Sequence, residues 1–291
     1  MILNKERQGE TFIFAGAVLW GLFPVITVLS YNQLSPLLSL GGSTLFSSIF
    51  FALLLSLKKQ WHQIKNLSAL KYILLVTLFS GILYYLFYFF ALRYANAGNV
   101  SIIALTEIFF SYLLFHFFKK DPLPIWHISG AILMIIGAII VIYPNIKEFR
   151  GGEVLMLMGA TIAPFGNFFQ QKARKMVSSE MIMFIRSLLT TMFVLLTAFV
   201  LKNSFSVPNL RDSLTFLIIN GVFLLGFSKI MWIEGIHRIS VTKSNALSSI
   251  SPLLTLFFAW ILLQHPPTFW QLFSFIPMFF GVIFLGITKK S

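Results

Sequence analysis

A single carboxylate inside a long apolar stretch is the residue of this sequence best suited to chemistry. Glu107 follows the run V-S-I-I-A-L-T and precedes I-F-F-S-Y-L-L-F. A charge at the centre of a membrane-crossing helix costs about 2.5–3.5 kcal/mol on insertion scales, so it requires a cavity, a partner or a proton. Glu107 could bind a cationic group or a proton in such a cavity. The alternatives are a structural pair with Arg186 or Lys229, or a neutral acid bonded to a helix carbonyl.

One lysine and several aromatic side chains could complement that carboxylate. Lys229 and Trp232 share a helix face because they are three residues apart, and Tyr84 and Tyr88, four apart, share another. Trp20 lies in the middle of the first apolar run. Aromatic faces can hold a cation. The alternatives are ordinary packing for each ring, since the chain has 34 phenylalanines, and headgroup contact for the lysine.

A row of hydroxyl side chains forms a further candidate. Ser244, Ser248, Ser251 and Thr255 fall on one helix face, and Ser251 stands 144 residues after Glu107. Other residues of the chain also recur at this offset, so Ser251 is the counterpart of Glu107. This favours Ser248 and Ser251 as residues that line a cavity. The alternative is close helix–helix contact, which small hydroxyl residues allow in membranes.

The sequence P-F-G-N places Asn167 beside Pro164 and Gly166 in the middle of another apolar run. It predicts an interruption of the helix, with freed backbone carbonyls, and such backbone is tolerated in a membrane only beside protein or water. Asn167 is therefore a candidate pocket residue. A plain proline kink is the alternative.

Motifs for other kinds of chemistry are missing from the sequence. The chain has no cysteine, which excludes disulfides and thiolate metal sites. His116 has no second histidine or glutamate at metal-ligand spacing, and there is no glycine-rich phosphate loop and no Ser/His/Asp set. We therefore expect no enzymatic activity, no catalytic residues, no metal and no cofactor.

Composition indicates an integral membrane protein made of helices. The 291 residues are 57% hydrophobic and 11% charged, with a mean hydropathy of +0.86, whereas a soluble domain is about 25% charged. Apolar runs of about 20 residues, enough to cross the hydrocarbon as a helix, follow one another with short polar gaps. The formal net charge of +13 comes from residues at the ends of these runs, so we expect membrane lipid rather than nucleic acid as the partner.

Ten spans follow from the apolar runs and the Gly, Pro, Asn and Lys residues that bound them. They cover residues 11–30, 37–57, 69–91, 98–118, 125–143, 153–171, 179–201, 212–235, 243–263 and 268–288. Fifteen of the 22 lysine and arginine residues then fall on one side of the membrane, five on the other, and two inside spans. The positive-inside rule places both termini in the cytoplasm, consistent with an even number of crossings.

The two halves of the chain repeat each other. Gly9-Glu10 and Gly16-Ala17 return as Gly152-Glu153 and Gly159-Ala160, an offset of 143. Asp121-Pro122-x-x-x-Trp126 and Gly137 return as His265-Pro266-x-x-x-Trp270 and Gly281, an offset of 144. Each half contains five spans, so the second copy enters the membrane from the opposite side. We expect an all-α membrane fold of ten helices, with one five-helix repeat in residues 1–146 and an inverted one in 147–291.

These motifs resemble the drug/metabolite transporter superfamily, EamA type. Each repeat opens with G-E-x-x-x-x-x-G-A. Later in each repeat come the end of the third span and a Pro-x-x-x-Trp segment, in the same order, so the resemblance covers essentially the whole chain. It implies ten helices and a central cavity lined mainly by spans 1, 3, 4, 6, 8 and 9. It also implies small metabolites as substrates.

The sequence therefore predicts a secondary transporter that works by alternating access in a bacterial inner membrane. Glu107 and Lys229 together favour amino acids or related zwitterionic or cationic solutes, with protons as a further partner and export favoured by the family. The alternatives are a translocator of lipids or lipid-linked metabolites, and a membrane subunit without transport activity.

Overall fold

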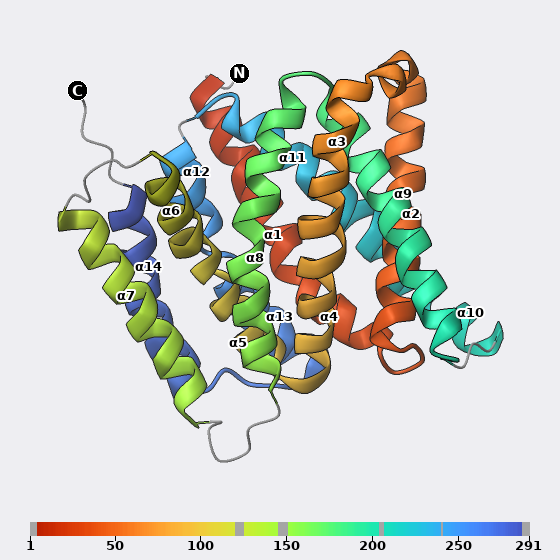
Figure 1. Cartoon of the computed structure of the whole chain (residues 1–291). Helices are drawn as coiled ribbons and strands as arrows, with labels where there is room; N and C mark the ends of the chain where they lie inside the picture. The colour runs from red at the N-terminus through yellow and green to blue at the C-terminus, as the bar shows by residue number, and fades with distance from the viewer. Residues whose placement is uncertain (1–4, 120–124, 145–150, 204–206, 240, 287–291) are drawn as a thin grey trace.

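The computed structural model describes residues 5–119, 125–144, 151–203, 207–239 and 241–286, and these residues form an all-helical bundle (Figure 1). The first half contains α1 (Lys5–Ser30), α2 (Pro36–Leu57), η1 (Trp61–Lys65), α3 (Leu67–Val76), η2 (Thr77–Leu83), α4 (Tyr84–Tyr94), α5 (Ala97–Ala104), α6 (Thr106–Lys119) and α7 (Ile125–Ile142). The second half contains α8 (Gly152–Arg174), α9 (Ser179–Val200), α10 (Val207–Ile218), η4 (Ile219–Phe227), α11 (Ser228–Ile236), α12 (Val241–Ser248), α13 (Ser251–Leu263) and α14 (Phe269–Gly286).

The apolar runs explain why these segments lie together as long helices. Eight stretches of the described chain are long and apolar enough to cross a membrane, and Ser251–Leu263 and Phe269–Leu285 are shorter apolar helices. Described helical segments lie within each of the ten ranges expected from the sequence, and eight of these segments have the length and hydropathy of a membrane crossing. The protein is therefore a multi-pass membrane protein built from helices.

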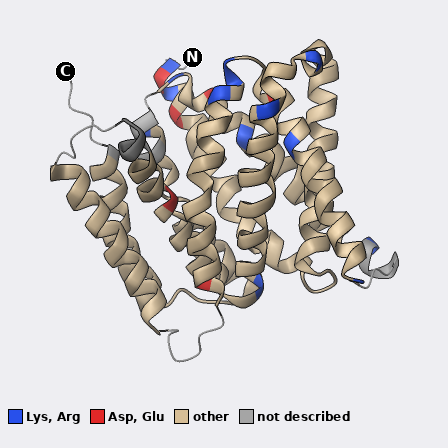
Figure 2. Ribbon diagram, viewed as in Figure 1, with Lys and Arg blue, Asp and Glu red and all other residues tan. Residues whose placement is uncertain are grey.

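Corresponding helices of the two halves run in opposite directions. α1 begins at the upper end of the bundle in Figure 1 and descends, whereas α8 begins at the lower end and ascends. Likewise α7 descends and α14 ascends. Lysine and arginine gather at the end where α1 begins, which we call the basic end (Figure 2). We call the opposite end, where α5, α8 and α14 begin, the far end.

Local backbone features recur in both halves at equivalent positions. Ser35 caps α2 and Ser178 caps α9, and each side chain accepts a bond from a backbone amide three residues later. Past the C-terminal ends of the same two helices, Lys59 and Lys202 both take a positive φ, of 53° and 52°. The π-helical segments η2 and η4 widen the third helix of each half. The fold thus repeats in its irregularities as well as in its helices.

Two helix pairs join the halves through small residues. In the α7–α14 pair, Gly130 lies so close to α14 that a methyl group there would stand 2.9 Å from the Gly281 carbonyl oxygen. In the α2–α9 pair, hydroxyl groups meet in the core, Thr44 with Thr191 at 2.8 Å and Ser47 with Ser187 at 3.2 Å. Small residues allow such close approach in membranes, where apolar burial alone does not drive association.

The expected interruption at Pro164 is absent, because α8 continues without a break from Gly152 to Arg174 with the proline inside it. Gly166 serves packing instead: a methyl group there would collide with the Ser80 side chain of η2. The helix breaks of the bundle lie elsewhere. They separate α5 from α6 at Leu105 and α12 from α13 at Ser249–Ile250.

Candidate functional site

Glu107 lies directly after the break between α5 and α6. The Leu105 amide donates to the Ile102 carbonyl, and the Leu105 carbonyl accepts from the Ile108 amide. Both bonds join residues three apart, so the backbone forms tight turns at the break. Glu107 is thereby the second residue of α6, where the first amides of a helix point outward and favour an anion. The break thus places a carboxylate at a helix start inside an otherwise apolar run.

Asn167 of α8 is the direct partner of Glu107. Its Nδ2 donates a hydrogen bond of 2.7 Å to Glu107 Oε1, and both side chains are half-buried. Glu107 belongs to the first half and Asn167 to the second. The two residues singled out separately in the sequence therefore form one contact across the halves, although Asn167 lies on an unbroken helix.

Lys229 and Trp20 form a second contact between the halves. The Lys229 ammonium lies 3.8 Å from the centre of the Trp20 ring, a distance typical of a cation–π interaction. Trp20 stacks on Phe23, with ring centres 4.8 Å apart, and Phe23 in turn contacts Tyr88, with ring centres 5.4 Å apart. The structure thus places one anion, Glu107, and one cation, Lys229, in contacts that each join the two halves.

The two predicted tyrosines pack in the aromatic core. Tyr84 and Tyr88 have ring centres 5.7 Å apart and are 8% and 1% exposed. Tyr88 also contacts Phe23, with ring centres 5.4 Å apart, so the tyrosines and Phe23 form an aromatic wall in the core.

Ser251 serves helix packing, which corrects its prediction as a residue lining a cavity. Its hydroxyl donates to the Ala17 carbonyl at 3.0 Å, and Thr255 donates to the Gly21 carbonyl at 2.9 Å. Both side chains are buried, so α13 uses them to bind the backbone of α1. Ser248 lies half-buried in α12, before the break. Trp232 is half-buried in α11, where its backbone lies near Gly16.

Arg186, a possible structural partner of Glu107 by sequence, is a buried cation. It is 5% exposed in α9, and its guanidinium lies 5.7 Å from the centre of the Tyr85 ring. Among the described residues no carboxylate forms an ion pair with it. Glu234, by contrast, pairs with Arg238 at 2.6 Å near the basic end.

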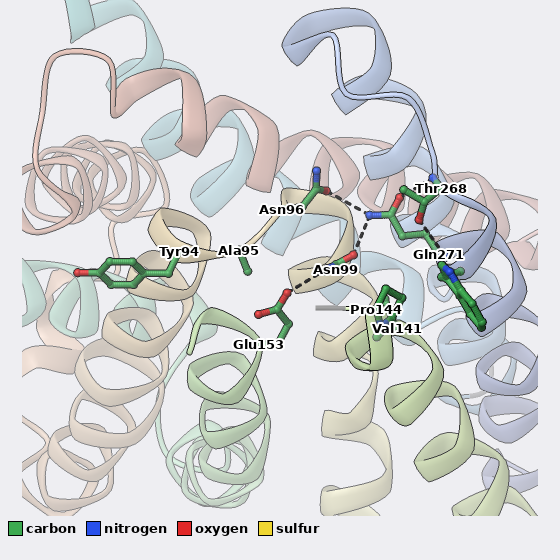
Figure 3. Close-up of a pocket in the computed structure, with 10 residues that line it drawn as sticks. Tyr94, Ala95, Asn96, Asn99, Val141, Pro144, Glu153, Thr268 and Gln271 are labelled. Atoms are coloured by element: carbon green, nitrogen blue, oxygen red, sulfur yellow. Dashed lines mark hydrogen bonds between the residues drawn. The ribbon is translucent and has the colours of Figure 1, made fainter. Parts of the chain in front are cut away.

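A polar pocket at the far end was missed from the sequence (Figure 3). It has a volume of about 360 Å³ and lies where α5, α8 and α14 begin. Asn99 donates to Glu153 at 3.1 Å, and Gln271 donates to Asn99 at 2.7 Å and to Asn96 at 3.3 Å. The repeat Gly9-Glu10/Gly152-Glu153 identified the carboxylate as part of a pattern. Nothing in the sequence identified its amide partners.

A second pocket is an apolar groove of about 410 Å³. It is formed by α1, the α12–α13 segment and α14 and is lined by Phe14, Leu247, Ile250, Leu253, Phe275 and Phe279. Within the described ranges, no group of three or more His, Asp or Glu residues could hold a metal ion.

Comparison with known proteins places these features in a family. The model of the EamA-like transporter family matches the chain twice, over residues 7–143 and 150–287. A protein of Bacillus subtilis (strain 168) with the name "Uncharacterized transporter YoaV" is 19% identical over 260 residues, which cover 88% of this chain and 89% of that protein. A solved crystal structure has the same fold, with a TM-score of 0.69, 16% identity and 96% of both chains covered.

Proposed function

Because the chain belongs to the EamA-like transporter family, whose model matches both of its halves, we propose that it is a secondary transporter of small organic solutes that works by alternating access. Residues 1–146 and 147–291 are the two inverted repeats, each with five crossings. The opposite directions of α1 and α8, and of α7 and α14, support this division (Figure 1). Rocking of one repeat against the other exposes the site to each side in turn.

The basic end faces the cytoplasm. The accumulation of lysine and arginine there (Figure 2) supports this orientation through the positive-inside rule, with both termini cytoplasmic. The Bacillus relative supports a bacterial plasma membrane as the location. Export is the direction that the family resemblance favours.

The observation that carries the proposal is the presence of two polar contacts between the repeats, Glu107–Asn167 and Lys229–Trp20. Each contact joins one residue from each repeat, so movement of the repeats changes both. A carboxylate and an ammonium that each join the repeats suit a solute with both charges. The substrates are therefore amino acids or related zwitterionic or cationic solutes, with Glu107 as the group that binds the substrate ammonium or exchanges a proton.

Glu107→Gln tests this role. Purified protein is first screened against amino acids and amines by thermal shift, and the ligands found are then assayed for transport in proteoliposomes. A charged hydrogen bond contributes about 1.5–3 kcal/mol, so we expect the variant to lose about 10- to 150-fold in ligand affinity or transport. Glu234→Gln, the same change near the basic end, is the control and should leave both intact. Equal transport by Glu107→Gln and the wild type would remove Glu107 from the mechanism.

The apolar groove favours a second candidate, a translocator of lipids or lipid-linked solutes. Its lining is apolar and it lies beside the break between α12 and α13, so an acyl chain could occupy it while a headgroup reaches the interior. Movement of a fluorescent phospholipid between leaflets of the proteoliposomes, unaffected by Glu107→Gln, would favour this function. We expect no such movement.

A further inference from the structure

We propose that two equivalent polar contacts, one at each end of the bundle, are the gates that alternate during transport. The far gate consists of Glu153, Asn99 and Gln271, and the basic gate consists of Lys243 with Glu6 and Glu10. These are positioning residues, because they hold helices of the two repeats together rather than contact the transported solute. The proposal rests on the alternating-access function proposed above.

The far gate is buried and joins three helices (Figure 3). Glu153 at the start of α8 accepts from Asn99 of α5, and Asn99 accepts from Gln271 of α14. Glu153, Asn99 and Gln271 are each only 4% exposed, and the Thr268 amide donates to Gln271 at 2.9 Å. Because α5 belongs to the first repeat and α8 and α14 to the second, the far end cannot open between the repeats while these bonds persist.

The basic gate joins the repeats at the other end. The Lys243 ammonium of α12 forms ion pairs with Glu6, at 2.7 Å, and with Glu10. Both carboxylates belong to α1. The side chains are 37–59% exposed, so solvent screens these pairs and weakens them relative to the buried network of the far gate.

The two gates occupy the same places in the two repeats. Glu10 is equivalent to Glu153 at the offset of 143, and Asn99 is equivalent to Lys243 at the offset of 144. At the far gate, a carboxylate near the start of α8 binds a residue near the start of α5. At the basic gate, a carboxylate near the start of α1 binds a residue near the start of α12. The two repeats therefore have equivalent polar contacts, one closing each end of the bundle.

Backbone packing follows the same symmetry beside each gate. A methyl group at Gly152 would collide with Ala95 and stand 2.9 Å from the Ala91 carbonyl oxygen, and one at Gly9 would collide with Arg238 and Ile239. Ala95 and Ile239 are themselves equivalent at the offset of 144. Both ends are therefore closed by a tight glycine contact with a polar bond next to it. Because the basic gate is the more exposed of the two, we expect the resting protein to open more often at the basic end.

Side-specific labelling of a cysteine measures which gate is open. The chain has no cysteine of its own, so Ala104→Cys introduces the only thiol. Ala104 is half-buried at the end of α5, directly before the break and three residues before Glu107. A membrane-impermeant maleimide is applied to right-side-out and inside-out vesicles, and the rate of labelling is measured from each side.

Asn99→Ala should raise labelling from the far side by at least about tenfold, because a state populated at roughly 0.1–10% has that much room to grow. Lys243→Ala should raise labelling from the basic side instead. Asn203→Ala, beyond the end of α9 at the far end, and Lys175→Ala, at the basic end, are the matched controls and should change neither rate. Unchanged rates in the gate variants, or a rise from the wrong side, would overturn the proposal.

Exchange of the two equivalent residues gives a stricter test. Asn99→Lys with Lys243→Asn places the ammonium at the far gate and the amide at the basic gate. Relative to the wild type, labelling from the far side should fall and labelling from the basic side should rise. If the exchanged protein does not fold, as judged by its gel-filtration profile, Asn99→Ala and Lys243→Ala still decide the question.

Transport is measured on the same vesicles, so that the two proposals fail separately. If the gate variants change labelling as expected but no tested solute is transported, the proposed function is refuted and the gate proposal stands. Transport that proceeds while gate variants label like the wild type would refute the gates and leave the function.

Discussion

Asn167→Leu tests whether the contact between Glu107 and Asn167 joins the two halves energetically. The substitution removes the 2.7 Å bond to the Glu107 carboxylate while keeping a side chain of similar size. Side-chain hydrogen bonds between membrane helices average about 0.6 kcal/mol, with a maximum near 1.7, and bonds to a charged group contribute about 1.5–3 kcal/mol. Since Glu107 is only half-buried, we expect a loss of about 1–2 kcal/mol.

The assay is a double-mutant cycle in detergent micelles. The free energy of unfolding by SDS is measured for the wild type, Asn167→Leu, Glu107→Gln and the double variant. In the Glu107→Gln background the acceptor is neutral, so Asn167→Leu should cost about 0.5 kcal/mol there, leaving a coupling of about 0.5–1.5 kcal/mol. Gln171→Leu, an exposed change one turn further along α8, is the control. Equal losses in both backgrounds would show that the bond does not depend on the charge of Glu107, and would refute the reasoning.

The remaining predictions concern the lysine and the packing of the halves. Lys229→Ala removes the cation over Trp20 and should reduce the affinity for a ligand with a carboxylate about tenfold or more, whereas Lys229→Arg should retain most of it; titration calorimetry with a ligand from the screen distinguishes them. Gly130→Ala would place a methyl group 2.9 Å from backbone atoms of α14 and should destabilise the protein by about 1–3 kcal/mol. Thermal unfolding measures this loss, with the exposed Ile132→Ala as the control, and no change would contradict the close contact of α7 and α14.

The approximate positions of the helices could be predicted from the sequence because each long apolar run contains a helical segment. The irregularities within them could not. The α5–α6 break at Leu105 falls in the run I-I-A-L-T-E, which contains neither proline nor glycine, and the π-helix η2 follows α3 within one apolar run. Pro164, which does carry a helix-breaking signal, lies inside an intact helix, and proline is tolerated within membrane helices.

The candidate site was partly predictable for a related reason. A carboxylate is costly in an apolar run, so Glu107 was identifiable from the sequence alone, and Asn167 was identifiable as a polar interruption. Their contact was not, because it joins helices 60 residues apart. Ser251 was misassigned because hydroxyl groups line cavities and bind neighbouring backbones at the same spacing. The amides Asn99 and Gln271 lie near helix starts, where polar residues are common and give no signal.

The two π-helical segments have a mechanical consequence for the aromatic wall. A wide turn accommodates one more residue than an α-helical turn would, and one residue corresponds to a rotation of about 100° around an α-helix. η2 therefore sets the angular position of Tyr84 and Tyr88 relative to α3, and η4 does the same for Lys229 relative to α10. Deleting a single residue from either segment would rotate these side chains about the helix axis by about a quarter turn, out of the interior. The length of the helix would hardly change.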